Sequence, residues 1–243
     1  MNFLKDAKSH SLIRYSKVTE KEAREIVLLK ATRCKWHKCS FCDYHLDSSE
    51  NIEENFSINK TQLDKVTGEF KILDVANSGS FFELDSMTVK YIKYICNKVD
   101  IKTLICESHW MYKDKVKKLK DDFKNIGVNL KVRIGVETFD YLFRESYLTK
   151  GISEYDPYVI SKYFDRVCLL FGLPGQTAES MLIDIEIALK YFEQVHVNIM
   201  NSNTTRIKPS PSVLRQFKEK IYPIFADNKR VEILFSNTDF GIG

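Results

Sequence analysis

The sequence predicts an α/β fold: a partial (βα)6 TIM-like barrel, in which an open parallel sheet carries its helices on the outside. Short runs rich in β-branched residues alternate with helix-like stretches, which is the order of βαβ units. About six such units are present, and right-handed crossovers would wind them into an open barrel, because a closed one needs eight. A chain of 243 residues with 44% hydrophobic content can bury one core.

The expected strands and helices follow from these periodicities. Strands are expected at Glu25–Lys30, Lys71–Ala76, Thr103–Glu107, Leu130–Glu137, Arg166–Phe171 and Val195–Met200, with a seventh candidate at Val231–Phe235. Helices are expected near Lys60–Phe70, Thr88–Lys98, Tyr112–Ile126, Asp140–Leu148, Ala178–Phe192 and Ser212–Phe225. In such a barrel the chemistry belongs on the loops after the carboxyl ends of the strands.

We expect a single domain over residues 1–243. Residues 1–24 would form an N-terminal extension, and residues 201–243 a C-terminal segment that closes the barrel. The chain has no stretch resembling a signal peptide and no run of eighteen apolar residues. These features predict a cytoplasmic protein without a membrane partner. In a reducing compartment, six cysteines indicate metal binding or burial rather than disulfides.

The charge pattern favours a small-molecule partner over nucleic acid. The formal net charge is +4, from 37 basic and 33 acidic residues. In the densest basic run, Lys113 to Lys124, aspartates are interleaved with the lysines, which is typical of a solvated helix face. A nucleic-acid surface usually needs clustered basic residues without such acids.

Three cysteines, Cys34, Cys39 and Cys42, directly follow the first expected strand. Three thiolates in one loop suit a 4Fe-4S cluster that leaves one iron open to a small molecule. The alternative is a structural zinc site in which His45 supplies the fourth ligand. The remaining cysteines, Cys96, Cys106 and Cys168, fall inside expected helix or strand and are interpreted as buried hydrophobic residues.

This loop resembles the signature loop of the radical S-adenosylmethionine (SAM) superfamily, which also carries an aromatic residue, here Phe41, before the third cysteine. The superfamily usually has three and then two residues between its cysteines, whereas this chain has four and then two. The resemblance implies a cluster held by the three cysteines and SAM bound at the open iron. It also implies an electron donor such as flavodoxin or ferredoxin, and a 5'-deoxyadenosyl radical that removes hydrogen from the substrate.

Four later segments resemble SAM-binding motifs of the same superfamily, and each follows a successive strand. The resemblance places SAM's amino group at Asn77, Ser78, Gly79 and Ser80, its ribose and carboxylate at Glu137 and Arg144, and its adenine beside Leu173. Glu107 would meet the sulfonium or the ribose, or would cap the following helix. Glu137 and Arg144 could instead form a structural ion pair.

Among compact members of the superfamily, the chain is most similar to the queuine lyases of bacterial queuine salvage, which release preQ1 by removing a cyclopentenediol from its amine. This resemblance implies a small-molecule substrate, a 7-deazaguanine base, and carbon–nitrogen lyase chemistry. A carboxylate, Asp239 or Glu83, would pair with the guanine-like edge, and Lys150 or His45 would protonate the departing amine. Substrate-lining candidates are Tyr44, Phe81, Phe82 and Asn198, although core packing is an alternative for each aromatic ring.

Three other functions stay open at this point. The motifs Lys150-Gly151 and Gly79-Ser80-Phe81 also resemble motifs of tRNA-modifying members of the superfamily. Activases of glycyl-radical enzymes have a similar length and act on a protein. A zinc-stabilised binding protein would use the same cysteines with His45 and would have no redox activity.

Overall fold

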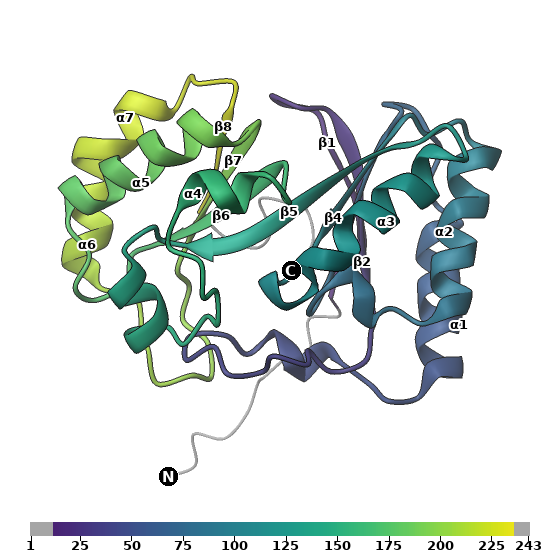
Figure 1. The fold of residues 1–243 in the computed structure, drawn as a ribbon, viewed down its shortest axis with the longest axis horizontal. Coiled ribbons are helices and arrows are strands. Elements are labelled where there is room, and N and C mark those ends of the chain that lie inside the picture. The colour runs from purple at the N-terminus through teal and green to yellow at the C-terminus, as the bar shows by residue number, and fades with distance from the viewer. Residues whose placement is uncertain (1–11, 236–243) are drawn as a thin grey trace, which may run out of the picture.

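The computed structural model describes residues 12–235, and these form one curled sheet with helices on its outer face (Figure 1). The eight strands lie in chain order: β1 (Tyr15–Val18), β2 (Arg24–Leu29), β3 (Ile72–Asn77), β4 (Thr103–Glu107), β5 (Asn129–Glu137), β6 (Arg166–Phe171), β7 (Gln194–Ile199) and β8 (Val231–Leu234). Strand β1 is antiparallel to β2, and every other neighbouring pair is parallel. The predicted open, parallel, barrel-like fold is confirmed.

The helices are α1 (Ile52–Leu63), α2 (Ser86–Lys98), α3 (Lys113–Lys124), α4 (Pro157–Ser161), α5 (Ala178–Tyr191), α6 (Pro211–Gln216) and α7 (Tyr222–Phe225). Short 3-10 segments occur at Tyr44–Asp47, Phe81–Glu83 and Trp110–Tyr112, and π-helical turns at Phe143–Tyr147 and Phe217–Ile221. None of the helices in the described part of the chain is long and apolar enough to cross a membrane.

Three expected helices differ from the structure, and the one expected at Ser212–Phe225 is divided into α6, the π-helical turn Phe217–Ile221 and α7. The helix expected at Lys60–Phe70 is α1, which begins earlier because the Asn51 side chain accepts a hydrogen bond from the Glu54 amide and caps it. The helix expected at Asp140–Leu148 ends in the π-helical turn Phe143–Tyr147. All seven strand candidates are confirmed to within two residues at either end, whereas β1 was not predicted and adds an antiparallel edge.

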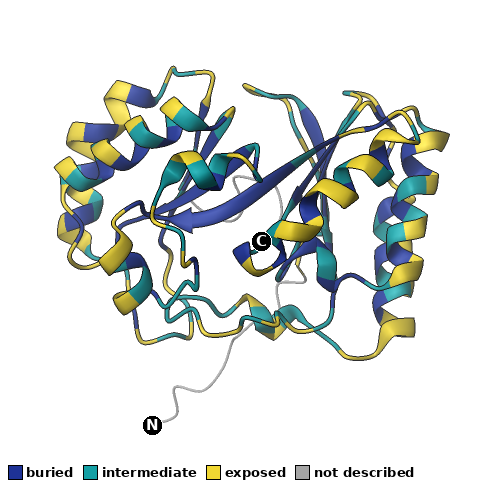
Figure 2. Ribbon diagram, viewed as in Figure 1, coloured by how far each residue is buried: buried dark blue, intermediate teal, exposed yellow. Residues whose placement is uncertain are grey.

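The sheet buries one face in a hydrophobic core and lines the barrel with the other. In β6, Val167, Leu169 and Phe171 are fully buried in the core under the helices, while Arg166 and Cys168 alternate with them and face inward. Figure 2 shows the strands buried and the helices exposed only on their outer sides. The helices therefore stabilise the sheet from outside and leave the interior to polar side chains.

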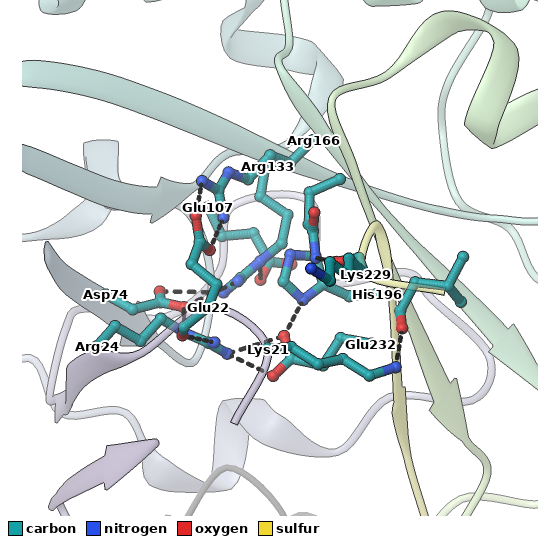
Figure 3. A network of polar contacts seen from close by, with 12 residues as sticks. Lys21, Glu22, Arg24, Asp74, Glu107, Arg133, Arg166, His196, Lys229 and Glu232 are labelled. Atoms are coloured by element: carbon teal, nitrogen blue, oxygen red, sulfur yellow. Dashed lines mark hydrogen bonds and ion pairs between the residues drawn. The ribbon is translucent and has the colours of Figure 1, made fainter. Parts of the chain in front are cut away.

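Buried ion pairs join the two ends of the open sheet at the floor of the barrel (Figure 3). Arg24 of β2 binds both carboxylate oxygens of Glu232 on β8, at 3.0 and 2.9 Å, and also contacts Asp74 on β3. His196 on β7 contacts Glu232 at 3.0 Å. The edge strand β8 is thus linked through side chains to β2, the neighbour of the other edge strand, although β8 and β1 are not paired in the described sheet.

Candidate active site

The three cysteines surround one pocket at the barrel mouth. The loop that follows β2 places Cys34, Cys39 and Cys42 half-buried, as free thiols. They line a cavity of about 230 Å³ together with His37, Lys38, His45 and Ser78. The sequence therefore predicted correctly that these three thiols share one site.

The cysteine loop is anchored to segments far away in the sequence. The Ser40 amide donates to the Leu148 carbonyl at 3.0 Å, and the Asn203 side chain donates to the Phe41 carbonyl at 2.6 Å. Within the four-residue spacing, His37 adopts a left-handed conformation with φ of 43°. A left-handed residue tightens the turn, which gives the longer spacing a local structural basis.

The pocket carries a buried oxygen that no described protein group satisfies. Ser78 is 9% exposed, lines the cysteine pocket, and its Oγ has no hydrogen-bond partner among residues 12–235. The Asn77 Oδ1 is likewise buried without a partner in the same part of the chain. Buried polar atoms are normally paired. The Ser78 Oγ beside the three thiols is therefore positioned to receive a ligand with N–H or O–H donors, and Asn77 is its neighbour in the chain.

The donor set fits an iron–sulfur cluster. Burial raises the pKa of Cys39, and raises that of Cys42 to about 12, so both are thiols until a metal stabilises the thiolate. Among residues 12–235, no three His, Cys, Asp or Glu side chains gather closely enough to hold a single metal ion. Three thiols from one loop around a shared cavity match the ligand number that leaves one iron open.

Glu83 is held in place by hydrogen bonds from the protein, and its expected role in binding substrate stays a prediction. Its Oε1 accepts from the Lys35 amide at 2.8 Å and from the Tyr112 hydroxyl at 3.2 Å, and its Oε2 accepts from the Ser80 amide at 2.7 Å. A Cβ at Gly79 would lie 2.0 Å from Glu83 Oε2. Glu83 therefore ties the cysteine loop to the Gly79 turn and has little capacity left for a base edge.

A second group of charged side chains lies at the ends of β4 and β5. Lys150 Nζ binds Glu137 Oε1 at 2.6 Å, and a Cβ on Gly135 would lie 2.7 Å from Glu137 Oε1 and 3.6 Å from Glu107 Oε1. Glu137 follows a register shift in β5 and has φ of 69°, an uncommon conformation for a residue with a side chain. The missing side chain of Gly135 thus lets these groups approach one another.

The ion pair expected between Glu137 and Arg144 is absent from the described contacts, because Glu137 pairs with Lys150. Arg144 is fully buried and contacts Glu145 and the carbonyls of Thr138 and Glu154 instead. Its guanidinium holds the loop after β5 together. These contacts give Arg144 a structural role, and its expected role in binding SAM stays a prediction.

Two expected substrate-stacking rings belong to the protein's own packing. Phe81 is 1% exposed and packs in the core against Phe123, with ring centroids 6.1 Å apart. Phe82 packs against Tyr112 at 5.1 Å. Core packing, the alternative left open by the sequence, holds for Phe81, whereas Phe82 is partly buried against the core.

The other candidates lie around the mouth. Tyr44 is 57% exposed, and burial of its hydroxyl, together with Cys42, Glu107 and Glu137, raises its pKa. Asn198 is half-buried near the end of β7, on the face of the strand that carries His196. Asp239 lies outside the described residues.

Leu173, Phe41 and His45 also lie near this mouth. Leu173 is buried in a small apolar cluster against which Phe41 packs. The Lys150 ammonium lies 5.6 Å from the centre of the Phe41 ring. The His45 ring packs edge-on against the His37 ring at 4.3 Å. These positions agree with a binding site at the barrel mouth. The SAM-binding roles expected of Leu173 and Phe41, and the general-acid role expected of His45, stay predictions.

The sequence did not single out Gly135, Trp36 or Arg133. A glycine within a β-branched strand is a known signal of a close approach, and it would have marked Gly135. Trp36 sits between two cysteines, but its partner lies more than a hundred residues away.

Comparison with known proteins decides between the functions left open. The queuine lyase from Clostridium spiroforme, solved bound to SAM and queuine, superimposes with a TM-score of 0.92. It is 42% identical, and the match covers 96% of this chain and 100% of that one. This chain belongs to the queuine lyase family. The family assignment confirms the radical SAM interpretation and the lyase class.

Two further comparisons are weaker. SuiB from Streptococcus suis, solved bound to S-adenosylmethionine, is 12% identical, with a TM-score of 0.53 over 87% of this chain and 47% of that one, so it supports the fold alone. An uncharacterized protein of Methanocaldococcus jannaschii is 29% identical over 143 residues. The match covers 52% of the chain described here and 39% of the archaeal protein. This chain therefore spans well under two thirds of that relative. No family model matches the sequence.

Proposed function

We propose that this protein is a radical SAM queuine lyase that cleaves queuine to release the 7-deazaguanine base preQ1. The observation that carries the proposal is the match over the whole chain to a queuine lyase bound to SAM and queuine. The pocket lined by Cys34, Cys39 and Cys42 supports it, because the chemistry needs a cluster with one open iron. The family assignment favours this function over tRNA modification, enzyme activation and zinc-stabilised binding.

In this proposal Cys34, Cys39 and Cys42 hold a 4Fe-4S cluster. When bound, the cluster supplies the electron that cleaves SAM. Before cleavage, the unsatisfied oxygens of Ser78 and Asn77 would accept hydrogen bonds from the amino group of bound SAM. Glu83 keeps this turn against the cysteine loop through its bonds to Lys35 and Ser80. The protein's contribution is to position and shield the reactants.

Lys150 acts electrostatically. Burial lowers its pKa, but the carboxylate of Glu137, the Cys39 sulfur and Glu107 outweigh burial and raise it well above the usual value. An ammonium held so firmly is a poor proton donor. We therefore assign Lys150 to fixing Glu137 at the mouth and to balancing its charge, in place of the general-acid role considered from the sequence.

The proposal also includes the setting of the reaction. The whole chain, residues 1–243, would form one catalytic domain, with residues 1–24 as an N-terminal extension and residues 201–243 completing the barrel. A cytoplasmic flavodoxin or ferredoxin would donate the electron. Strands β1 and β8 support the assignment of both terminal segments to the same sheet, since each adds to one of its edges.

Anaerobic reconstitution tests this function. The protein should take up about four iron and four sulfide per chain, a number that follows from the cluster type. With SAM, a reductant and queuine, it should release 5'-deoxyadenosine and preQ1, both measured by chromatography with mass spectrometry. A reconstituted protein that cleaves SAM but leaves queuine intact would contradict the lyase assignment. A colourless protein with one zinc and no sulfide would contradict the cluster.

A further inference from the structure

The carboxylate of Glu107 stands apart from the other buried acids of the barrel. It ends β4 on the inner face, directly opposite Arg133 of β5 and four residues before the end of that strand at Glu137. Its side chain is 36% exposed, whereas those of Asp74 and Glu137 are 1% and 8% exposed. Glu107 is therefore the acid of this group that a molecule in the barrel can reach.

The cations beside Glu107 are engaged mainly with other acids. Arg133 binds the two oxygens of Asp74 through its terminal nitrogens, at 3.0 and 3.3 Å, and Lys150 binds Glu137 at 2.6 Å. Glu107 has only a 3.5 Å contact between its Oε2 and Arg133 Nε. No hydrogen bond to its carboxylate is found among residues 12–235.

The charges around Glu107 leave one negative charge in excess. Two neutral ion pairs surround Glu107, Arg133 with Asp74 and Lys150 with Glu137. The negative charge of Glu107 is therefore not balanced by a cation of its own. Burial raises the pKa of Glu107, and Arg133 and Lys150 offset this only in part. A carboxylate in this position is stabilised when a ligand brings a positive charge and N–H donors to it.

We infer that Glu107 binds the protonated amine of the substrate, with Arg133 as the positioning residue that aims its carboxylate. This assignment rests on the proposed function, because queuine carries a secondary amine at the bond that is broken. Alkyl amines are protonated at neutral pH, as the lysine side chain is. The Glu107 carboxylate would then fix the reacting carbon–nitrogen bond at the same mouth as the cysteine pocket.

This inference differs from the two roles that the sequence allowed for Glu107, which were SAM binding and helix capping. Capping is not its role, because the His109 side chain caps the next helical turn by accepting from the Met111 amide. The SAM role predicts that changing Glu107 weakens SAM binding. The amine role predicts that it weakens only bases that carry an alkyl amine side chain and leaves SAM binding unchanged.

Three bases that share one ring separate these roles. Queuine and preQ1 carry an alkyl amine on the side chain of the ring, whereas 7-cyano-7-deazaguanine has the same base edge and a nitrile in place of that amine. We would measure their dissociation constants on the anaerobic holoenzyme with SAM and without reductant. For Glu107→Gln we expect queuine and preQ1 to bind about 10-fold to 100-fold more weakly, since a hydrogen bond to a charged group is lost. Binding of 7-cyano-7-deazaguanine and of SAM should stay within about twofold of the wild type.

Other outcomes overturn the assignment. Equally weaker binding of all three bases would place Glu107 at the base edge. Weaker binding of SAM would show that Glu107 binds the cofactor. Unchanged binding of the amines would remove it from the site. A wild-type protein that binds none of the bases would instead contradict the proposed function, so the two failures are distinguishable.

Two variants control the measurement. Glu193→Gln changes an exposed acid at the opposite ends of the strands and should bind every ligand as the wild type does. Glu107→Asp keeps the negative charge but shortens the side chain by one methylene. Binding of the two bases with an alkyl amine should therefore weaken, by less than in Glu107→Gln, and binding of the other ligands should not change. If Glu107→Gln fails to fold, this second variant decides by the same pattern. Arg133→Lys should raise the KM for queuine and spare SAM binding.

Discussion

Gly151 lies directly against the indole of Trp36: a Cβ at Gly151 would be 2.1 Å from the Trp36 Cζ2 atom. The indole N–H donates to the Thr149 carbonyl at 2.8 Å, and the ring stacks on His109 at 5.3 Å. Because Trp36 lies between Cys34 and Cys39, the turn that carries Lys150 supports the cysteine loop. The two halves of the candidate site therefore share one packing contact.

Replacing Gly151 by alanine tests this contact. Gly151 has φ of 74°, so Gly151→Ala combines backbone strain with displacement of Trp36. We expect lower iron content after reconstitution and a loss of roughly 2–4 kcal/mol in the free energy of unfolding. Gly127→Ala is the matched control, because Gly127 has φ of 77° and no atom within 4 Å of its Cβ position. Equal iron content in both variants would contradict a role for the contact.

Cys39→Ala tests the proposed ligand set. Cys39 lies in a loop outside the main core, so the variant should fold with nearly the wild-type melting temperature, but it should lose the cluster and SAM cleavage. Cys96→Ala removes a thiol from the core and should keep the cluster. Iron and sulfide analysis with 5'-deoxyadenosine release measures both. Retained SAM cleavage in Cys39→Ala would show that the ligands lie elsewhere.

Asp184 should make stability depend on pH. Its Oδ1 accepts from the Phe139 amide at 2.7 Å, and burial raises its pKa to about 7. Because the unfolded pKa is about 4, folding favours the protonated form, and this stabilisation is lost as pH rises from about 4 to about 7. Asp184→Asn keeps the acceptor for Phe139. Its melting temperature relative to the wild type should therefore increase between pH 5 and pH 8.

The exposed Asp121→Asn controls for the loss of one negative charge in that comparison. Thermal unfolding of all three proteins across the pH range gives the answer. A constant difference between Asp184→Asn and the wild type would mean that Asp184 does not titrate in this window.

Glu232 should be needed to close the barrel floor. It is the common partner of buried Arg24 and of His196, and its removal leaves the Arg24 guanidinium without its bidentate pair. Glu232→Ala should cost roughly 3–5 kcal/mol in urea unfolding, which is typical of a buried pair with one partner removed. Glu186→Ala, on the exposed side of α5, should cost under about 0.5 kcal/mol. A similar cost for both would show that the floor network does not hold the sheet ends together.

The fold was largely predictable because its signal is local. Alternating β-branched runs and helical stretches gave each strand from β2 to β8, since every strand buries one face under helices. Boundaries that depend on a cap or a turn were less predictable, as α1 shows with its Asn51 cap. Strand β1 was missed because its pairing with β2 depends on a partner strand and carries little periodic signal in four residues.

The candidate site also has features that the local sequence predicts and features that depend on distant segments. The sequence by itself determined that Cys34, Cys39 and Cys42 share a loop at the mouth, because residues so close along one chain after a strand must lie together. Only the tertiary structure decided that Glu83 and Arg144 are occupied by the protein, that Glu137 pairs with Lys150, and that Glu107 keeps an accessible carboxylate. The physical reason is that the partners of a buried charge come from distant segments, and folding alone brings them within hydrogen-bond distance.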